Sequence, residues 1–141
     1  MNRLIEELNV NPVTLSLELE AAVIEHKFDD DGEIYVTEGF PFWIKILKSS
    51  GYVGFTTYIM FRQSSTLLER LELSNRFNKR NYFTTSFVDG EKLIIDHVLC
   101  FKSGLLSETF IRGSRQYANA ISTSLSEIDS DNKVLLPLGA T

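Results

Sequence analysis

Two segments that read as β-strands are apolar on both of their sides, and this feature limits the possible folds more than any other. In residues 93–101 the odd positions are Leu93, Ile95, His97, Leu99 and Phe101, and the even positions are Ile94, Asp96, Val98 and Cys100. Residues 52–61 behave in the same way. A strand with one face in water alternates apolar and polar residues instead, so both faces of this sheet need cover.

Turn and capping signals place the remaining elements. Strands are predicted over residues 23–28, 33–37, 42–47, 52–61, 82–88 and 92–101, and helices over residues 66–78 and 105–125. Glycines in the turns at Gly32 and Gly90 supply the positive φ angle that tight hairpins need. Thr66 and Glu69 have the spacing of a capping box, which begins a helix.

The N-terminal region is less definite. Residues 2–9 read as a short helix that Pro12 interrupts. Residues 13–22 alternate like a strand, yet Leu15 and Leu19 also fit a helical stripe. Glu and Ala favour helix, so we predict a helix there.

These elements predict an α+β two-layer sandwich. The order is helix, four strands, helix, two strands, helix, and consecutive strands joined by tight turns pair antiparallel. We therefore expect an antiparallel sheet of about five to six strands with helices on one face. The chain of 141 residues has the size of one domain, with a core at about residues 14–125 and a loose tail at residues 126–141.

Charge and cysteine content exclude several classes of protein. The formal net charge is −5, whereas binding to nucleic acid or to an anionic membrane usually needs a positive excess, so we expect neither. No stretch approaches the roughly 20 apolar residues that span a bilayer. A single cysteine and a start without a signal-peptide core fit a cytoplasmic protein.

The doubly apolar strands predict an interaction surface. Two substantial helices can cover one face of the sheet, so the second face should meet a copy of the chain or another, unidentified protein. The predicted surface residues are Tyr58, Met60, Val98 and Cys100 on the strands, with Leu73 and Phe77 on the middle helix. The alternative is that the N-terminal helix or strong sheet curvature covers this face within one molecule. The sequence does not fix the hairpin register that would decide between faces.

The middle helix also carries two amides in an apolar stripe. On a period of 3.6 residues, one face holds Leu67, Leu68, Leu71, Asn75 and Asn78. We interpret Asn75 and Asn78 as structural, because buried amides are usually bonded to nearby backbone. The alternative function is a small-molecule or enzymatic domain whose pocket lies near this pair.

No motif indicates a catalytic, metal or cofactor site. Three consecutive aspartates, residues 29–31, should point apart and form a solvated turn rather than a calcium loop. Three residues along a strand separate His97 from Cys100, so they point to opposite faces and cannot share a zinc ion or form a catalytic pair. We expect His97 to be partly buried and hydrogen-bonded. The chain is therefore predicted not to be an enzyme.

The segment that contains the middle helix and the following hairpin resembles the YbjN family, whose members are described as candidate regulators of bacterial sensory transduction. The matching features are Asn75 and Asn78, the turn at residues 89–90, the apolar strand and Gly104, and the likeness covers roughly residues 14–125. The turn at residues 101–105 is poorer in glycine than in many relatives. The resemblance implies a fold similar to type III secretion chaperones, frequent homodimers and no established enzymatic activity.

Overall fold

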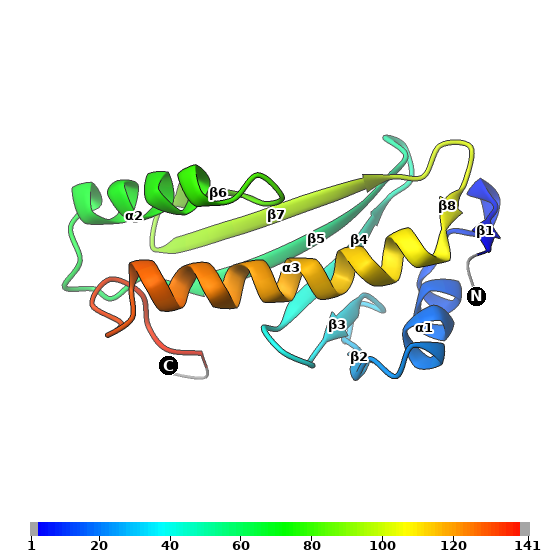
Figure 1. Ribbon diagram of the computed structural model, residues 1–141, viewed down its shortest axis with the longest axis horizontal. Helices are drawn as coiled ribbons and strands as arrows, with labels where there is room; N and C mark the ends of the chain where they lie inside the picture. Colours follow the sequence, from blue (N-terminus) through cyan, green and yellow to red (C-terminus); the bar gives the residue numbers. More distant parts are fainter. Residues whose placement is uncertain (1–2, 139–141) are drawn as a thin grey trace.

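The computed structural model describes residues 3–138, and its centre is a six-stranded antiparallel sheet (Figure 1). The strands are β2 (His26–Phe28), β3 (Ile34–Val36), β4 (Phe42–Leu47), β5 (Tyr52–Met60), β6 (Thr85–Asp89) and β7 (Lys92–Cys100). They pair in the order β2-β3-β4-β5-β7-β6. All six predicted strands are present, so the predicted α+β class is confirmed.

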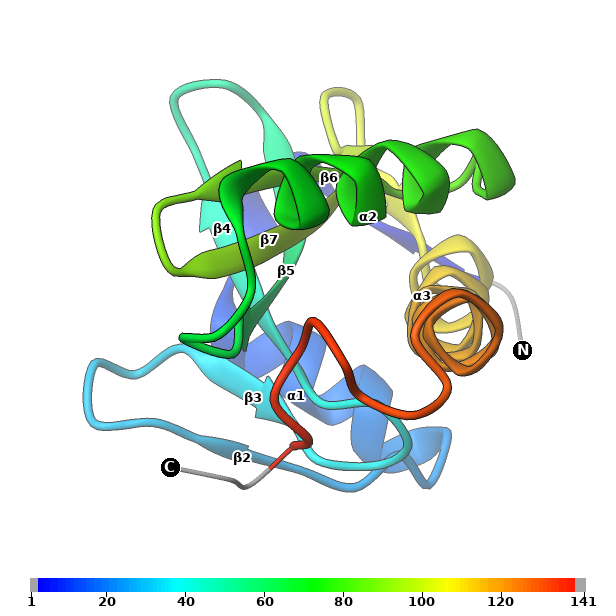
Figure 2. The same ribbon diagram turned by 90° about the vertical axis from the view of Figure 1, so that its left-hand side faces the viewer.

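The three helices lie on the same side of this sheet. They are α1 (Pro12–Ala21), α2 (Leu67–Arg80) and α3 (Ser107–Ile128). Figure 2 shows α2 crossing in front of β6 at the top and α3 end-on at the right, with β4, β5 and β3 to the left of α3. We call the side that faces the helices the inner face and the opposite side the outer face. The choice of helix for the ambiguous segment at residues 13–22 is correct, and the capping box of Thr66 and Glu69 begins α2.

Close packing of α3 on β5 and β7 makes the core. A Cβ at Gly113 would lie 3.5 Å from both Phe55 and Leu99, at ordinary van der Waals distance, so α3 lies directly against β5 and β7 at this point. One turn later Tyr117 is fully buried, and its hydroxyl bonds the Ile95 carbonyl oxygen at 2.7 Å and the Thr57 hydroxyl at 3.0 Å. Burial raises the pKa of Tyr117 well above its usual value. These two bonds satisfy the buried Tyr117 hydroxyl, as polar groups inside a protein require.

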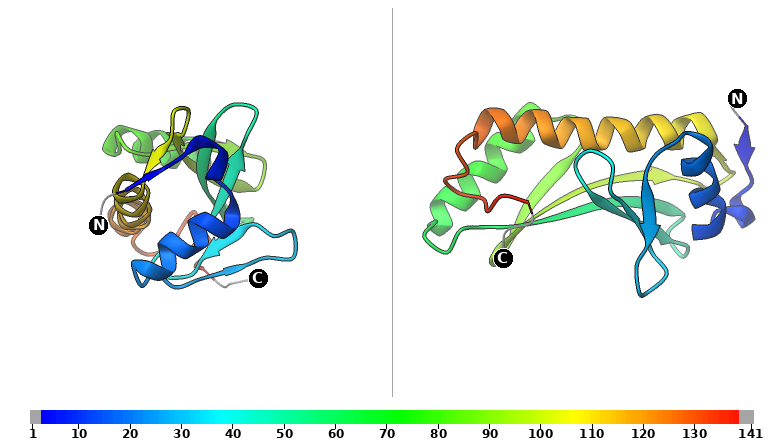
Figure 3. Two further views of the ribbon diagram at one scale, coloured as in Figure 1. Left: turned by 90° about the vertical axis from the view of Figure 1, so that its right-hand side faces the viewer. Right: turned by 90° about the horizontal axis from the view of Figure 1, so that it is seen from below.

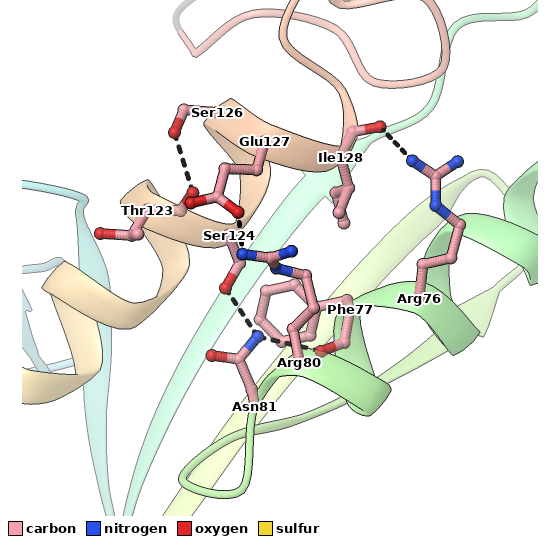
Figure 4. A network of polar contacts seen from close by, with 9 residues as sticks. All are labelled: Arg76, Phe77, Arg80, Asn81, Thr123, Ser124, Ser126, Glu127 and Ile128. Carbon is pink, nitrogen blue, oxygen red and sulfur yellow. Dashed lines mark hydrogen bonds and ion pairs between the residues drawn. The ribbon is translucent and has the colours of Figure 1, made fainter.

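The C-terminal ends of α2 and α3 are bonded to each other (Figure 4). Arg76 donates to the Ile128 carbonyl oxygen at 3.0 Å, and Arg80 forms an ion pair with Glu127. The Asn81 amide donates to the Ser124 hydroxyl at 2.7 Å. These bonds keep the two helices together over the inner face.

The N-terminal prediction of a helix over residues 2–9 is wrong. This region forms β1 (Leu4–Ile5) and a short 3-10 turn, η1 (Glu7–Asn9), and β1 pairs with β8 (Leu105–Leu106). The right-hand view of Figure 3 shows this small sheet beside the start of α3. Long-range pairing with residues 105–106 therefore overrides the local preference for helix.

After α3, part of the predicted tail folds into a turn that is held by a single carboxylate. The buried carboxylate of Asp129 accepts hydrogen bonds from the backbone N–H groups of Lys133, Val134 and Leu135. The chain then returns to the end of β5, where Leu135 forms a bridge with Phe61. The three bonds to one carboxylate bend a polar segment into a fixed turn, although its composition is typical of loops.

Candidate interaction surface

Within residues 3–138 no helix packs on the outer face of the sheet. Helix α1 lies near one end of the sheet on the inner side, where the Ser16 hydroxyl is 2.7 Å from Nε2 of His26 (Figure 3). The alternative in which the N-terminal helix covers the second face is therefore wrong. Apolar outer-face side chains that remain exposed are Leu47, Tyr52, Met60, Phe87 and Val98.

An aromatic row crosses the middle of the outer face. The ring centroids of Tyr35 and Trp43 are 4.4 Å apart, and those of Trp43 and Tyr58 are 5.6 Å apart. The three rings come from β3, β4 and β5, and all three are half-buried. Cross-strand register places them on one side because Tyr35 is opposite Trp43, which is opposite Thr56 on the same face as Tyr58. Burial also raises the pKa of Tyr35 above its usual 10.0.

Three lysines accompany these rings. Nζ of Lys27 lies 5.8 Å from the Tyr35 ring centroid, and those of Lys45 and Lys92 lie 5.4 and 5.0 Å from the Tyr58 centroid. The Lys45 ammonium also donates to the Tyr58 hydroxyl at 3.0 Å, and this bond raises the pKa of Lys45 above 10.5. The lysine stems cover part of the aromatic surface while their charged ends reach water.

Beside the aromatic row the outer face includes Gly54 of β5. Gly54 contributes no side chain, and a Cβ placed there would meet only ordinary contacts at 3.8 and 3.9 Å. Next to it, the Thr56 hydroxyl bonds the Asp96 carboxylate across β5 and β7. Gly54 itself lies between Lys45 on β4 and Val98 on β7.

The predicted surface residues divide into two groups. Tyr58, Met60, Val98 and Cys100 all lie on the outer face. Met60, Val98 and Cys100 are exposed, whereas Tyr58 is half-buried. Leu73 and Phe77 are instead 2% and 0% exposed and belong to the core between α2 and the sheet.

Leu73 and Phe77 are therefore not available to a partner, which corrects that part of the prediction. The sequence correctly placed Leu73 and Phe77 on a different side of α2 from Leu67, Leu68 and Leu71. However, the exposed side of the helix is the one that carries these three leucines. Asn78 bonds the backbone of Ser86 on β6, and Asn75 is exposed one turn earlier.

The sequence model of the YbjN family, described as "Putative bacterial sensory transduction regulator", matches residues 11–130. The chain belongs to the YbjN family. The crystal structure of YbjN from E. coli, described as "a putative transcription regulator", superimposes with a TM-score of 0.77 at 19% identity, over 90% of this chain and 96% of that chain. At this identity the likeness concerns the fold alone. No curated protein matches the sequence.

The β2–β3 turn of this YbjN-family chain is a hairpin turn, as predicted, but its carboxylates do not all point apart. Oxygens of Asp29, Asp31 and Glu33 come within 4.8 Å of one another. Asp29 shapes the turn, because its carboxylate accepts hydrogen bonds from the backbone N–H groups of Asp31 and Glu33. The same carboxylate also accepts a hydrogen bond from Nε1 of Trp43 at 3.2 Å. The expectation that consecutive aspartates diverge is wrong because the bonds to Asp29 curl the turn around it.

His97 lies on the inner face of the YbjN fold and Cys100 on the outer face, which is the separation that strand geometry predicts. The His97 ring stacks on Phe83 with centroids 3.9 Å apart, and its buried Nε2 has no hydrogen-bond partner among the described residues. Burial lowers the pKa of His97 below 6.5, and a bond with the Phe83 backbone partly offsets this shift. The prediction of a fully hydrogen-bonded histidine is therefore wrong for Nε2.

A cavity of this YbjN-family chain lies between α1 and α3, and neither Asn75 nor Asn78 lines it. It has a volume of about 760 Å³ and is lined by Glu18, Arg112 and Arg115, among others. Arg112 is paired with Glu108, and Arg115 donates to the Ala22 carbonyl oxygen at 2.8 Å. Both arginines thus support the local structure. No helix of the described residues has the length and apolar character needed to cross a bilayer.

Proposed function

We propose that this chain is a non-enzymatic protein-interaction module, a regulatory or chaperone-like adaptor, that acts as a homodimer through the outer face of its sheet. The single observation behind the proposal is that the outer face is uncovered and carries five exposed apolar side chains and a row of three aromatic rings. Contiguous apolar surface of this kind is typical of interaction sites.

The composition of the outer face also fits an interface. Tyrosine, tryptophan and methionine are enriched in such surfaces. The description of the YbjN family as a regulator fits a protein that works by binding. We extend the proposal to a cytoplasmic location, to a likeness to type III secretion chaperones, and to a second, unidentified protein partner, with neither nucleic acid nor membrane as a target.

The proposal is tested by light scattering after gel filtration. Wild-type protein at high micromolar concentration should have twice the chain mass of 16.1 kDa. Val98→Glu and Tyr58→Glu should weaken the dimer at least about tenfold, which corresponds to about 1.4 kcal/mol, while circular dichroism stays unchanged.

A matched control is Leu17→Glu on α1, because Leu17 is also an exposed apolar residue but lies away from the outer face. It should leave the dimer intact. A wild-type monomer at high micromolar concentration would contradict the proposal. Equal weakening by Leu17→Glu and Val98→Glu would contradict the assignment of the interface.

A further inference from the structure

Strand β6 is an edge of the sheet, and one of its residues is bonded on the free side. β6 is the last strand in the order β2-β3-β4-β5-β7-β6, so its outward backbone groups have no strand beside them. Yet the Ser86 N–H donates to Oδ1 of Asn78 at 2.7 Å, and Nδ2 of Asn78 donates to the Ser86 carbonyl oxygen at 3.0 Å. Both outward groups of Ser86 are therefore satisfied by a single side chain.

This pairing imitates a neighbouring strand. In an antiparallel ladder, two opposite residues exchange one N–H and one C=O each. The carboxamide of Asn78 offers the same acceptor and donor, and so occupies the position that a residue of a seventh strand would take. A matching strand cannot bond Ser86 while Asn78 holds it.

Two serines hold this arrangement in place. The hydroxyls of Ser74 and Ser86 are 2.7 Å apart, and Oγ of Ser86 also bonds the Ser74 carbonyl oxygen at 3.2 Å and Oδ1 of Asn78 at 3.1 Å. Ser74 and Asn78 are one turn apart on α2, so the helix is attached to the edge strand at two successive turns.

An open β6 would be a hazard. Its sequence is Thr-Ser-Phe-Val-Asp, with no proline or lysine, and Phe87 is exposed. Edge strands of this kind pair with other copies unless charges, proline or a covering element prevent it. The opposite edge, β2, is only three residues long and contains Lys27, so it is already a poor template.

We propose that Asn78 closes the β6 edge against strand pairing with a second copy of the chain, and so restricts self-association to other surfaces. Asn78 therefore determines the specificity of self-association, because it blocks pairing at the β6 edge and leaves other surfaces available. It is not required for the chain to fold. The proposal does not depend on the outer-face dimer, because it concerns the edge of the sheet alone.

The test compares Asn78→Ala with Asn75→Ala. Asn75 lies one turn away on the exposed side of α2, which makes it a matched control. Hydrogen exchange of the Ser86 amide should become at least about tenfold faster in Asn78→Ala and stay unchanged in Asn75→Ala. Asn78→Ala should also form species larger than wild type as concentration rises.

A cross-link identifies the surface that pairs. In a Cys100→Ser background, Thr85→Cys places a thiol on the edge strand in a chain with no other cysteine. Mild oxidation should cross-link this protein only when Asn78→Ala is also present. Where Asn78→Ala proves too unstable, Asn78→Asp keeps the acceptor for the Ser86 N–H, loses the donor, and should give the same cross-link in lower yield.

The results of these edge-strand experiments can be distinguished from the results of the homodimer test. An equal cross-link with and without Asn78→Ala would overturn the proposal, as would an Asn78→Ala protein that has wild-type size and no edge cross-link. A wild-type monomer that becomes cross-linked on Asn78→Ala would support closure of the edge while contradicting the homodimer.

Discussion

The two faces of the sheet are made by the same strands but differ in kind. The inner face carries aliphatic and phenyl side chains such as Phe42, Phe55 and Ile95, which are completely buried under α3 and α2. The outer face carries rings with polar ends, such as Tyr35, Trp43 and Tyr58, which are only half-buried. A surface of the second kind can stay in water and also be covered by a partner, because polar ends such as those of Trp43 and Tyr58 already have hydrogen-bond partners within the chain.

The comparison makes a strong prediction about stability. Phe55→Ala on the inner face should lower the free energy of unfolding by about 3–5 kcal/mol, because it leaves a cavity in a close-packed core. Val98→Ala on the outer face should cost less than about 1 kcal/mol, since Val98 is 49% exposed. Urea denaturation in a Gly54→Arg background, chosen to keep the chain monomeric, measures both. A Val98→Ala cost close to that of Phe55→Ala would erase the distinction between the faces.

The same chemical change on each face sharpens the contrast. Tyr117→Phe removes a buried hydroxyl that bonds Thr57 and Ile95, and should lower the free energy of unfolding by about 1–3 kcal/mol. Tyr58→Phe removes a hydroxyl that bonds Lys45 at the surface, and should cost about 0.5 kcal/mol or less. Thermal unfolding of the two variants should therefore separate clearly. Equal midpoints would show that the outer face is as rigid and dry as the core.

Mild acid should lower the stability of the folded chain through His97 on the inner face. The folded-state pKa of His97 is lowered below 6.5, so below that pH the unfolded chain binds a proton that the folded chain resists. Stability due to this group should thus be complete at pH 7.5 and fall as the pH drops through 6.5. His97→Phe, which keeps a ring for Phe83 to stack on, should flatten the pH dependence of the unfolding midpoint between pH 7.5 and 5. An unchanged slope in His97→Phe would contradict this assignment.

Alkaline pH should have a small effect on the stability that Lys45 contributes on the outer face. The pKa of Lys45 is raised above 10.5 by its bond to Tyr58, so its contribution is present below pH 10.5 and is lost as the pH rises through the folded-state value. Lys45→Met should therefore reduce the loss of stability between pH 9.5 and 11.5 by a small amount. A larger loss in Lys45→Met than in wild type would show that the sign is wrong.

Much of the fold follows from local signals in the sequence. Glycine in the turns, the Thr66–Glu69 capping box and apolar runs place the strands and helices within a few residues, since each signal acts over a short distance. The two segments that are apolar on both sides, residues 52–61 and 93–101, are the strands β5 and β7 in the interior of the sheet. The turn at residues 129–135 and the β1–β8 pair were missed, because they depend on contacts that the local sequence pattern does not show.

The site was predicted less completely because faces depend on register. Tyr58, Met60, Val98 and Cys100 share parity within their strands, and the observed pairing of Tyr58 with Ile94 puts them on one side. The aromatic row was missed, because Tyr35 and Trp43 become neighbours only once β3 and β4 are aligned. The helical period correctly separated two sides of α2. It could not show which side faces the sheet, because that depends on the bonds from Ser74 and Asn78 to Ser86 on β6.

The most direct test of the account is the exposure of Trp43, the only tryptophan, which lies in the middle of the outer face. Acrylamide quenching of its fluorescence should weaken as protein concentration rises from nanomolar to high micromolar, and should stay constant in Gly54→Arg. Quenching that is independent of concentration in the wild-type protein would mean that no second copy covers this face.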